Sequence, residues 1–396
     1  MPGMDKYSTA VIGGGAAGIC AAISTARRGE SVVICEKMPQ LGKKILASGN
    51  GRCNLLNEDM SEAHYNPAAR KLIISVFEQF GKTQILDFFK RLGLETYSVE
   101  GRIFPVTNQA SSVLKVLEME LKRLSVPVEF NFHCTGVSSV RNGILVSSQA
   151  GRKIECRKLI ITGGGKTYPA FGSDGGMYRM AAQIGHTIVE PVPVAVPLIV
   201  KDPLCHLLQG QKIFAAARSI IEDKTGRAVR GDLLFTRYGL SGTCILDVSE
   251  AISIAVNRYR KAKVFVSVDM VPFMETDTLS NELNRRKKAK WSGEEMLTGI
   301  LPNKLALALR GLFESNNINT AVDILKDRRF IVAGTRGWNE AEFTGGGINV
   351  NEINPVTLES KLKKGIHFAG EVLDINGQRG GYNLGWAWAS GFVAGK

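Results

Sequence analysis

Residues 7–36 read YSTAVIGGGAAGICAAISTARRGESVVICE, and this stretch has the pattern of a βαβ unit. Residues 7–12 form a short apolar run typical of a strand, and residues 16–28 are rich in small residues that favour a helix. Residues 31–36 are a second apolar run. This order predicts two parallel strands joined by a helix, and hence an α/β fold.

The turn between the first strand and the helix satisfies G-x-G-x-x-G. Gly13 permits the tight turn, Gly15 lets the backbone approach a pyrophosphate at the positive end of the helix, and Gly18 allows close helix–strand packing. Glu36 ends the second strand and is placed to bind ribose hydroxyls. The pattern predicts a dinucleotide site without separating FAD from NAD. The predicted contact residues are Gly13, Gly15, Ala16, Ala17, Gly18, Glu36 and Lys37.

Two later features favour FAD. Residues 158–162 form a strand that runs into Gly163–Gly165, and a late strand at 366–369 precedes Gly370 and Glu371. An NAD enzyme normally completes its nucleotide fold before its catalytic domain, whereas FAD extends past its pyrophosphate and needs the chain to return. Glu371 is placed to accept a ribitol hydroxyl. We expect FAD to be bound without a covalent link, because no attachment histidine or cysteine is evident.

The last helix, expected over residues 384–394, is opened by a glycine-rich turn formed by Gly380, Gly381, Tyr382 and Asn383. The first N–H groups of a helix have no partner within the helix, and its amino end carries a partial positive charge. This turn is therefore predicted to face the flavin N1/O2 edge and to favour negative charge there.

The middle of the chain has a different composition. Pro191, Pro193 and Pro197 mark a boundary, after which come strand-like pieces at 212–221, 233–235, 244–248 and 264–268. Helix-like pieces follow at 281–290, 294–300 and 304–313. The order predicts a β unit that carries a helical insertion.

Composition excludes several classes of protein. No apolar run approaches the roughly 18–20 residues of a membrane helix, and no signal peptide is recognisable, so we expect a cytoplasmic protein that does not contact a membrane. The 7 cysteines lack the spacing of a disulfide framework or a zinc site, and no metal site is predicted. The net charge is +13, with a basic run at 285–290. Such a run is usually a solvated helix face, so nucleic acid is not the expected partner.

The chain resembles the bacterial BaiN-like flavoproteins, also called the YhiN or aminoacetone-oxidase-like family. The resemblance runs nearly end to end, and its specific elements are the Gly-Arg-Cys-Asn of residues 51–54 and the Gly-Glu-x-x-Asp of residues 370–374. Less specific matches lie at 42–44, 48–50, 101–105, 162–164, 168–169, 234–236, 239–242 and 344–347.

The resemblance implies a discontinuous glutathione-reductase-type FAD-binding Rossmann-like domain at 1–193 and 344–396. It also implies a β-barrel-like insert at 194–275 and 331–343, and a helical subdomain at 276–330. The loop at 43–54 would lie along the FAD, and the turn at 344–347 would lie close to the ring. The further cofactor residues implied are Lys43, Lys44, Gly51, Arg52, Cys53, Asn54, Val137 (through its backbone, to the adenine), Thr162, Gly163, Gly164 and Asp374.

The chain also departs from the family pattern. Arg237 and Thr243 stand where the family usually has His and Pro, and Gly176-Met177 replaces an Asp-Gly pair. A proton-transfer role for that histidine therefore does not carry over. Tyr168 and Arg237 are candidates for the substrate pocket, but no residue is assigned as catalytic, and the flavin is expected to supply the chemistry.

The predicted function is hydride transfer between flavin N5 and a small organic substrate, as an NAD(P)H-dependent reductase or an amine-oxidase-like enzyme. The chain lacks a second complete G-x-G-x-x-G unit, so NAD(P)H, if used, would dock only transiently. Two alternatives stay open: a flavin-dependent RNA-modifying enzyme, and a non-catalytic FAD-bound interaction protein.

Overall fold

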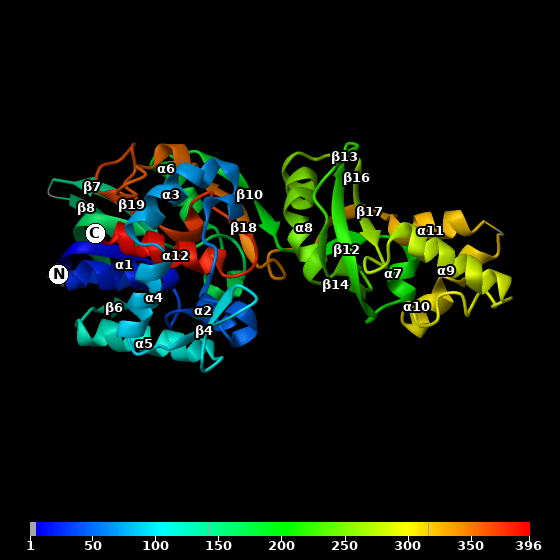
Figure 1. The fold of residues 1–396 in the computed structure, drawn as a ribbon. Helices are drawn as coiled ribbons and strands as arrows, with labels where there is room; N and C mark the ends of the chain where they lie inside the picture. The colour runs from blue at the N-terminus through cyan, green and yellow to red at the C-terminus, as the bar shows by residue number, and fades with distance from the viewer. Residues whose placement is uncertain (1–4, 142, 316) are drawn as a thin grey trace. The chain divides into compact units, whose positions relative to one another are not determined.

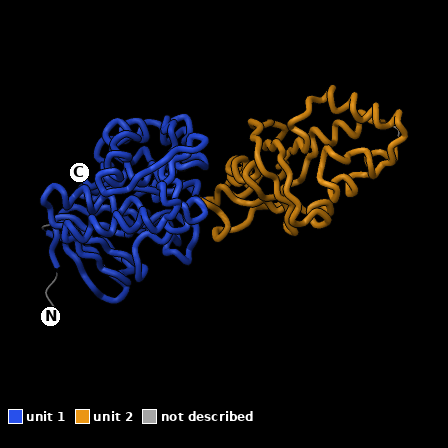
Figure 2. Tube along the Cα trace, turned by 60° about the horizontal axis from the view of Figure 1, so that its bottom comes forward, with its two compact units in different colours: residues 1–191, 343–396 blue, residues 192–342 orange. Residues whose placement is uncertain are grey.

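The computed structural model describes residues 5–141, 143–315 and 317–396. The chain divides into two compact units, which Figure 2 shows in different colours. Unit 1 consists of residues 1–191 and 343–396, and unit 2 consists of residues 192–342. Both ends of the chain therefore belong to unit 1.

The core of unit 1 is a seven-stranded sheet in the order β6-β2-β1-β9-β8-β7, with β19 also paired to β9. Of these strands, β6, β7, β8 and β19 are labelled in Figure 1. The pairings of β1 with β2 and β9, of β2 with β6, and of β9 with β19 are parallel, whereas β7, β8 and β9 pair antiparallel. The strands are β1 (Asp5–Ile12), β2 (Val32–Cys35), β6 (Val128–Glu129), β7 (Cys134–Val140), β8 (Gly143–Ser148), β9 (Lys153–Ile161) and β19 (Ile366–Phe368).

Strand β9 has two partners along one edge. Its first half, residues 153–156, pairs with β8, and its last residues, 159–161, pair with β19. Residues that follow β19 are thus delivered to the carboxyl end of the sheet, beside the turns that follow β1 and β9. This pairing returns the C-terminal part of the chain to the glycine-rich turn.

Helix α12 (Tyr382–Ala394) packs on α1 (Ala16–Arg27) at backbone distance. A Cβ added to Gly391 would lie 2.1 Å from the carbonyl oxygen of Ala17. The buried indoles of α12 are also tied to the core, because Trp386 Nε1 donates to Gly370 O at 3.1 Å and Trp388 Nε1 donates to Leu55 O at 3.2 Å. The C-terminal helix is therefore part of the central core.

Further elements surround this core. Besides α1 and α12, the α-helices of unit 1 among the described residues are α2 (Lys43–Ala47), α3 (Arg70–Gln79), α4 (Lys82–Arg91), α5 (Ala110–Arg123) and α6 (Gly176–Gln183). A small sheet contains β3 (Leu56–Asn57), β4 (Thr96–Val99) and β5 (Arg102–Pro105). Strand β10 (Ile188–Val194) pairs with β18 (Phe343–Ile348) where the chain leaves and re-enters the unit.

Unit 2 is built on an antiparallel sheet in the order β13-β12-β14-β15-β11-β17-β16. An additional pairing of β12 with β16 closes six of these strands into a barrel. The strands are β11 (Leu198–Val200), β12 (Lys212–Ile221), β13 (Lys224–Thr225), β14 (Val229–Thr236), β15 (Gly239–Ser241), β16 (Val264–Asp269) and β17 (Arg328–Thr335). The predicted α/β class with an inserted barrel is confirmed.

The helices of unit 2 are α7 (Pro203–Leu207), α8 (Thr243–Ser253), α9 (Thr276–Lys288), α10 (Asn303–Ala308) and α11 (Ile318–Lys326). Leu283 of α9 and Leu325 of α11 belong to the same buried cluster as Val266 of the barrel. The helical segment and the barrel therefore share one core. The three-part division of the chain stays a prediction.

Two local predictions were wrong. Residues 244–248, expected as a strand, lie in α8, where Ile245, Val248 and Ile252 are buried at helical spacing. A short apolar run fits a buried helix as well as a strand, so only its packing decides. Residues 294–300, expected as a helix, form turns, and Gly299 has a φ of +78°.

None of the helices in the described part of the chain is long and apolar enough to span a bilayer.

We predict that Gly391→Val lowers the free energy of unfolding of unit 1 by about 3 kcal/mol, because a branched side chain would press on the backbone of α1. Denaturant unfolding followed by tryptophan fluorescence would measure this. The control is Gly337→Ala, where an added Cβ meets nothing within 4 Å. Equal midpoints for the two variants would contradict the backbone contact.

Candidate functional site

A cavity of about 110 Å³ lies where β1, β2 and β9 end and α1 begins. Its walls come from five segments of unit 1, within residues 12–15, 35–44, 132–134, 162–164 and 171–177. The ends of parallel strands beside a helix amino terminus are the usual place for a nucleotide.

The three motif glycines have different surroundings. Gly13 has a φ of +101°, and a Cβ on Gly18 would lie 1.8 Å from Gly13 O, so the turn itself requires both. A Cβ on Gly15 would meet nothing within 4 Å. Gly15 lines the cavity and precedes the first turn of α1, whose N–H groups have no partner within the helix. This side of the cavity therefore suits an anionic group.

Glu36 fixes the glycine-rich turn. Its Oε2 accepts from Gly14 N at 2.6 Å, and its Oε1 accepts from Met38 N at 2.7 Å. Burial raises the pKa of Glu36, although these two hydrogen bonds act in the opposite direction. Each carboxylate oxygen retains a lone pair. The carboxylate can therefore still accept a ribose hydroxyl, and the ribose role of Glu36 stays a prediction.

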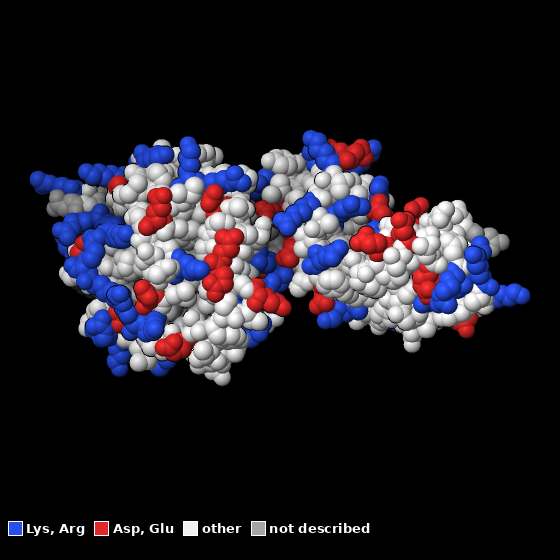
Figure 3. All heavy atoms as spheres, in the orientation of Figure 1, with Lys and Arg blue, Asp and Glu red and all other residues white. Residues whose placement is uncertain are grey.

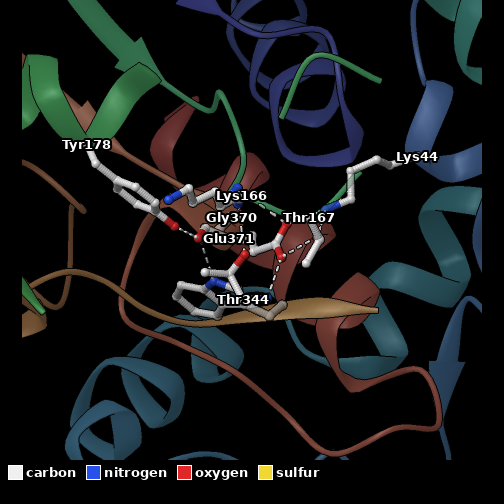
Figure 4. Close-up of polar contacts among 9 residues, drawn as sticks. Lys44, Lys166, Thr167, Tyr178, Thr344, Gly370 and Glu371 are labelled. Carbon is white, nitrogen blue, oxygen red and sulfur yellow. Dashed lines mark hydrogen bonds and ion pairs between the residues drawn. The ribbon is translucent and has the colours of Figure 1, made fainter. Parts of the chain in front are cut away.

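Glu371 joins several distant segments, as Figure 4 shows. Its carboxylate accepts from Lys44 Nζ at 2.6 Å, Thr344 N at 2.9 Å and Gly165 N at 3.3 Å. Thr167 Oγ1 donates to Glu371 Oε1 at 3.4 Å and accepts from Lys44 Nζ at 2.9 Å. A ribitol hydroxyl would have to donate to this carboxylate in addition to the donors that it already has. The ribitol role of Glu371 stays a prediction.

Lys44 connects the cavity with the Glu371 carboxylate. It lines the cavity next to Lys43, and its ammonium group reaches Glu371. A cofactor that extends from the cavity toward Glu371 would pass this ammonium group.

The loop before Asn54 has an unusual backbone, with left-handed φ values at Asn50 (+56°) and Cys53 (+60°). Burial raises the pKa of the Cys53 thiol to about 12, which excludes it as a ready thiolate. Gly51 and Arg52 are exposed, and the Arg52 guanidinium lies 4.7 Å from the ring centre of Phe104.

Two unpaired features meet at the start of α12. Among the described residues Asn54 Oδ1 is buried without a hydrogen-bond partner. A Cβ on Gly381, which precedes α12 with a φ of +101°, would lie 2.9 Å from this oxygen. The first N–H groups of α12 have no partner within the helix. An acceptor without a partner among the described residues and donors without a partner in their own helix thus lie together, which fits a flavin edge that carries both carbonyl and N–H groups.

The other residues predicted at the start of α12 are held by hydrogen bonds. Gly380 O accepts from Asn57 Nδ2 at 2.9 Å, and Tyr382 O accepts from Tyr65 O–H at 2.9 Å. The Asn383 amide donates to Gly377 O at 2.8 Å and accepts from Gly377 N at 2.9 Å.

Val137 lies in β7 opposite Val146 of β8, and the cavity wall nearest to it in sequence is residues 132–134. Asp374 N donates to Ile348 O at 2.9 Å. Tyr168 has a left-handed backbone (φ +55°), and its ring stacks on Phe171, with the ring centres 5.4 Å apart.

Arg237 belongs to unit 2, in the turn between β14 and β15, whereas Tyr168 belongs to unit 1. Their shared role in a substrate pocket stays a prediction. No group of three or more His, Cys, Asp or Glu side chains that could hold a metal occurs in the described ranges.

Sequence reasoning missed part of the cavity wall. The lining residues that were not predicted as contacts are Ile12, Gly14, Cys35, Gln40, Gly42, Phe132, His133, Cys134, Phe171, Gly172, Ser173, Asp174, Gly176 and Met177. The only local signal for those at 172–176 is the glycine-rich turn GSDGG, which resembles a loop before a helix rather than a binding motif.

We predict that Gly15→Val folds normally but loses bound FAD, because its side chain would enter the space that the cofactor needs. Gly18→Val should fail to fold, since its side chain would collide with Gly13 O. Circular dichroism and the ratio of flavin to protein absorbance would separate the two effects. Full flavin occupancy in a folded Gly15→Val protein would place the pyrophosphate elsewhere.

We also predict that none of the 7 cysteines reacts with a thiol reagent within minutes at pH 8, because all are buried. With a pKa of about 12 for Cys53, only about one thiol in ten thousand is ionised at that pH. Denaturation should expose all 7. Rapid labelling of Cys53 in the native protein would contradict its burial.

Known proteins resemble this chain over almost its whole length. Residues 7–396 match the family model described as HI0933-like protein Rossmann domain. The chain is 36% identical over 401 residues to the 3-dehydro-bile acid delta(4,6)-reductase of Clostridium scindens, covering 98% of this chain and 97% of that protein. It is 28% identical over 403 residues to the ribosomal RNA dihydrouridine synthase of Escherichia coli, with coverages of 98% and 97%.

A solved structure supports the fold. The 3-ketosteroid-delta4-(5alpha)-dehydrogenase of Rhodococcus jostii aligns with a TM-score of 0.51 and 13% identity, over 100% of this chain and 98% of that one. The predicted resemblance to BaiN-like flavoproteins is confirmed by the family match. The chain belongs to the HI0933-like family and is an FAD-dependent oxidoreductase.

Proposed function

We propose that this protein reduces a carbon–carbon double bond conjugated to a carbonyl group, with NAD(P)H as the source of electrons. The observation that carries the proposal is the end-to-end match to two proteins with very different substrates. A delta(4,6)-reductase of a 3-dehydro bile acid and a dihydrouridine synthase both add two hydrogens to a double bond conjugated to a carbonyl. The shared reaction, rather than either substrate, is what we transfer to this chain.

The residues of this chain have definable tasks in such a reaction. Bound FAD supplies hydride chemistry at N5. The amino end of α1 and Lys44 would offer positive charge to the phosphates. The amino end of α12 would favour negative charge on the flavin edge next to that helix end. The substrate gains a hydride on the carbon distal to the carbonyl and a proton on the adjacent carbon. Tyr168 of unit 1 is our candidate for placing the carbonyl or that proton.

We expect NADH or NADPH to bleach the flavin absorbance under anaerobic conditions, and a conjugated enone added afterwards to restore it. Stopped-flow absorbance measures both half-reactions. Bleaching by small amines, without a response to NAD(P)H, would instead support an amine oxidase. If neither kind of reductant bleaches the flavin, the non-catalytic alternative would be favoured.

A second candidate is a flavin-dependent enzyme that acts on RNA. The match to the Escherichia coli synthase and the net charge of +13 favour it. The basic run at 285–290 offers RNA less positive charge than its sequence suggests. Arg285 and Arg286 both pair with Glu282, and Arg286 is buried. On the face shown in Figure 3, acidic side chains lie among the basic ones.

If RNA is the substrate, ribosomal RNA fragments should bind at low salt and dissociate as salt rises from about 50 to 200 mM. A gel shift would measure this, and dihydrouridine in the product RNA would establish the reaction. The absence of any shift at low salt would exclude this candidate and leave a small conjugated carbonyl compound.

A further inference from the structure

Ser173 is a buried hydroxyl whose hydrogen-bonding capacity the protein does not use. Its residue is 4% exposed, and its Oγ has no partner in the part of the chain that the structure describes. A buried hydroxyl without a hydrogen bond is unfavourable, so each one needs an explanation. Ser173 lines the cavity at the amino end of α1, so its unused hydrogen bond is available to a ligand there.

The surroundings of Ser173 show what that ligand must be. A Cβ on Gly164, which has a φ of +73°, would lie 2.8 Å from Ser173 Oγ, so only glycine leaves room for this hydroxyl. Gly15 borders the same cavity and leaves the first turn of α1 open. An O–H donor and backbone N–H donors that have no partner within their own helix therefore line one cavity. An anionic group with several acceptor oxygens would satisfy both.

The segment that carries Ser173 is held at both of its ends. We call residues 171–174 the cofactor strap. Lys37 Nζ, from the residue after Glu36, forms an ion pair with Asp174 Oδ2 at 3.0 Å. Gly172, with a φ of +98°, approaches so closely that an added Cβ would lie 3.0 Å from Met38 Cγ. The strap thus connects the glycine turn after β9 with the segment after β2.

We propose that Ser173 donates a hydrogen bond to the pyrophosphate of FAD, and that the Lys37–Asp174 ion pair holds the strap closed over it. This inference rests on FAD as the resident cofactor. It assigns cofactor binding to a residue outside the glycine motif. It also makes FAD retention depend on an ion pair at the cavity edge.

The first test uses the holoprotein and the variant Ser173→Ala. Loss of a hydrogen bond to a charged group should speed FAD release on dilution by about tenfold, seen as recovery of flavin fluorescence. Phosphorus NMR should show the pyrophosphate resonance of the Ser173→Ala holoprotein displaced from its position in the wild-type holoprotein, a change that a merely structural serine would not produce. The matched control is Thr9→Val. Thr9 Oγ1 is also buried and unpartnered, but Thr9 does not line the cavity, so release should stay unchanged.

The second test is Asp174→Asn, which removes one charge of the ion pair. FAD release should become about threefold faster and lose its dependence on salt, because partly exposed ion pairs are screened by ions. Glu58→Gln, which removes the exposed Glu58–Lys82 pair elsewhere in unit 1, should leave release unchanged.

A Ser173→Ala protein that still contains FAD, releases it at the wild-type rate and keeps the wild-type phosphorus resonance would overturn this inference. The proposed function would not be affected by that result. A wild-type protein that neither contains nor takes up FAD would instead overturn the proposed function.

Discussion

Helix α12 packs on α1 with only the hydrogen of Gly391 between the two backbones, and the geometry of unit 1 depends on this approach. The helix that closes the chain is thereby fixed against the helix that opens the nucleotide motif. The parallel pairing of β19 with the last residues of β9 likewise fixes the C-terminal part of the chain against the central sheet. Together they place Gly370 beside Ala17, more than 350 residues earlier in the chain, so that a Cβ added to Gly370 would lie 2.9 Å from Ala17 Cβ. A cofactor longer than a mononucleotide can then be held from both ends.

Two carboxylates organise the site through backbone N–H groups. Glu36 holds the glycine turn through Gly14, and Glu371 holds Gly165 and Thr344 while pairing with Lys44. Fixing donors in advance means that little reorganisation is required when charge develops nearby. Among the described residues, two buried polar atoms at this site keep no hydrogen-bond partner, Ser173 Oγ at the cavity and Asn54 Oδ1 beside Gly381.

Unit 2 is inserted in the sequence of unit 1 between β10 and β18. Strands β10 and β18, which lead out of and back into unit 1, pair with each other, so the two ends of the insertion lie side by side. Within unit 2, the pairing of β12 with β16 closes the barrel and leaves a single core shared with α9 and α11. A barrel that closes on itself has few open strand edges, so it can be carried as an insertion.

The sequence by itself determined the βαβ unit around residues 7–36, the strand at 212–221 with both of its ends, and the family resemblance, because periodicity and glycine spacing are local properties. Residues 244–248 were mispredicted, since five apolar residues satisfy a strand and a buried helix equally. Only the tertiary structure decided the partners of Glu371 and the unpaired state of Ser173. Lys44 and Glu371 are 327 positions apart, and a hydrogen bond over that separation leaves no local pattern. Whether a buried hydroxyl finds a partner likewise depends on chain segments that only folding brings together.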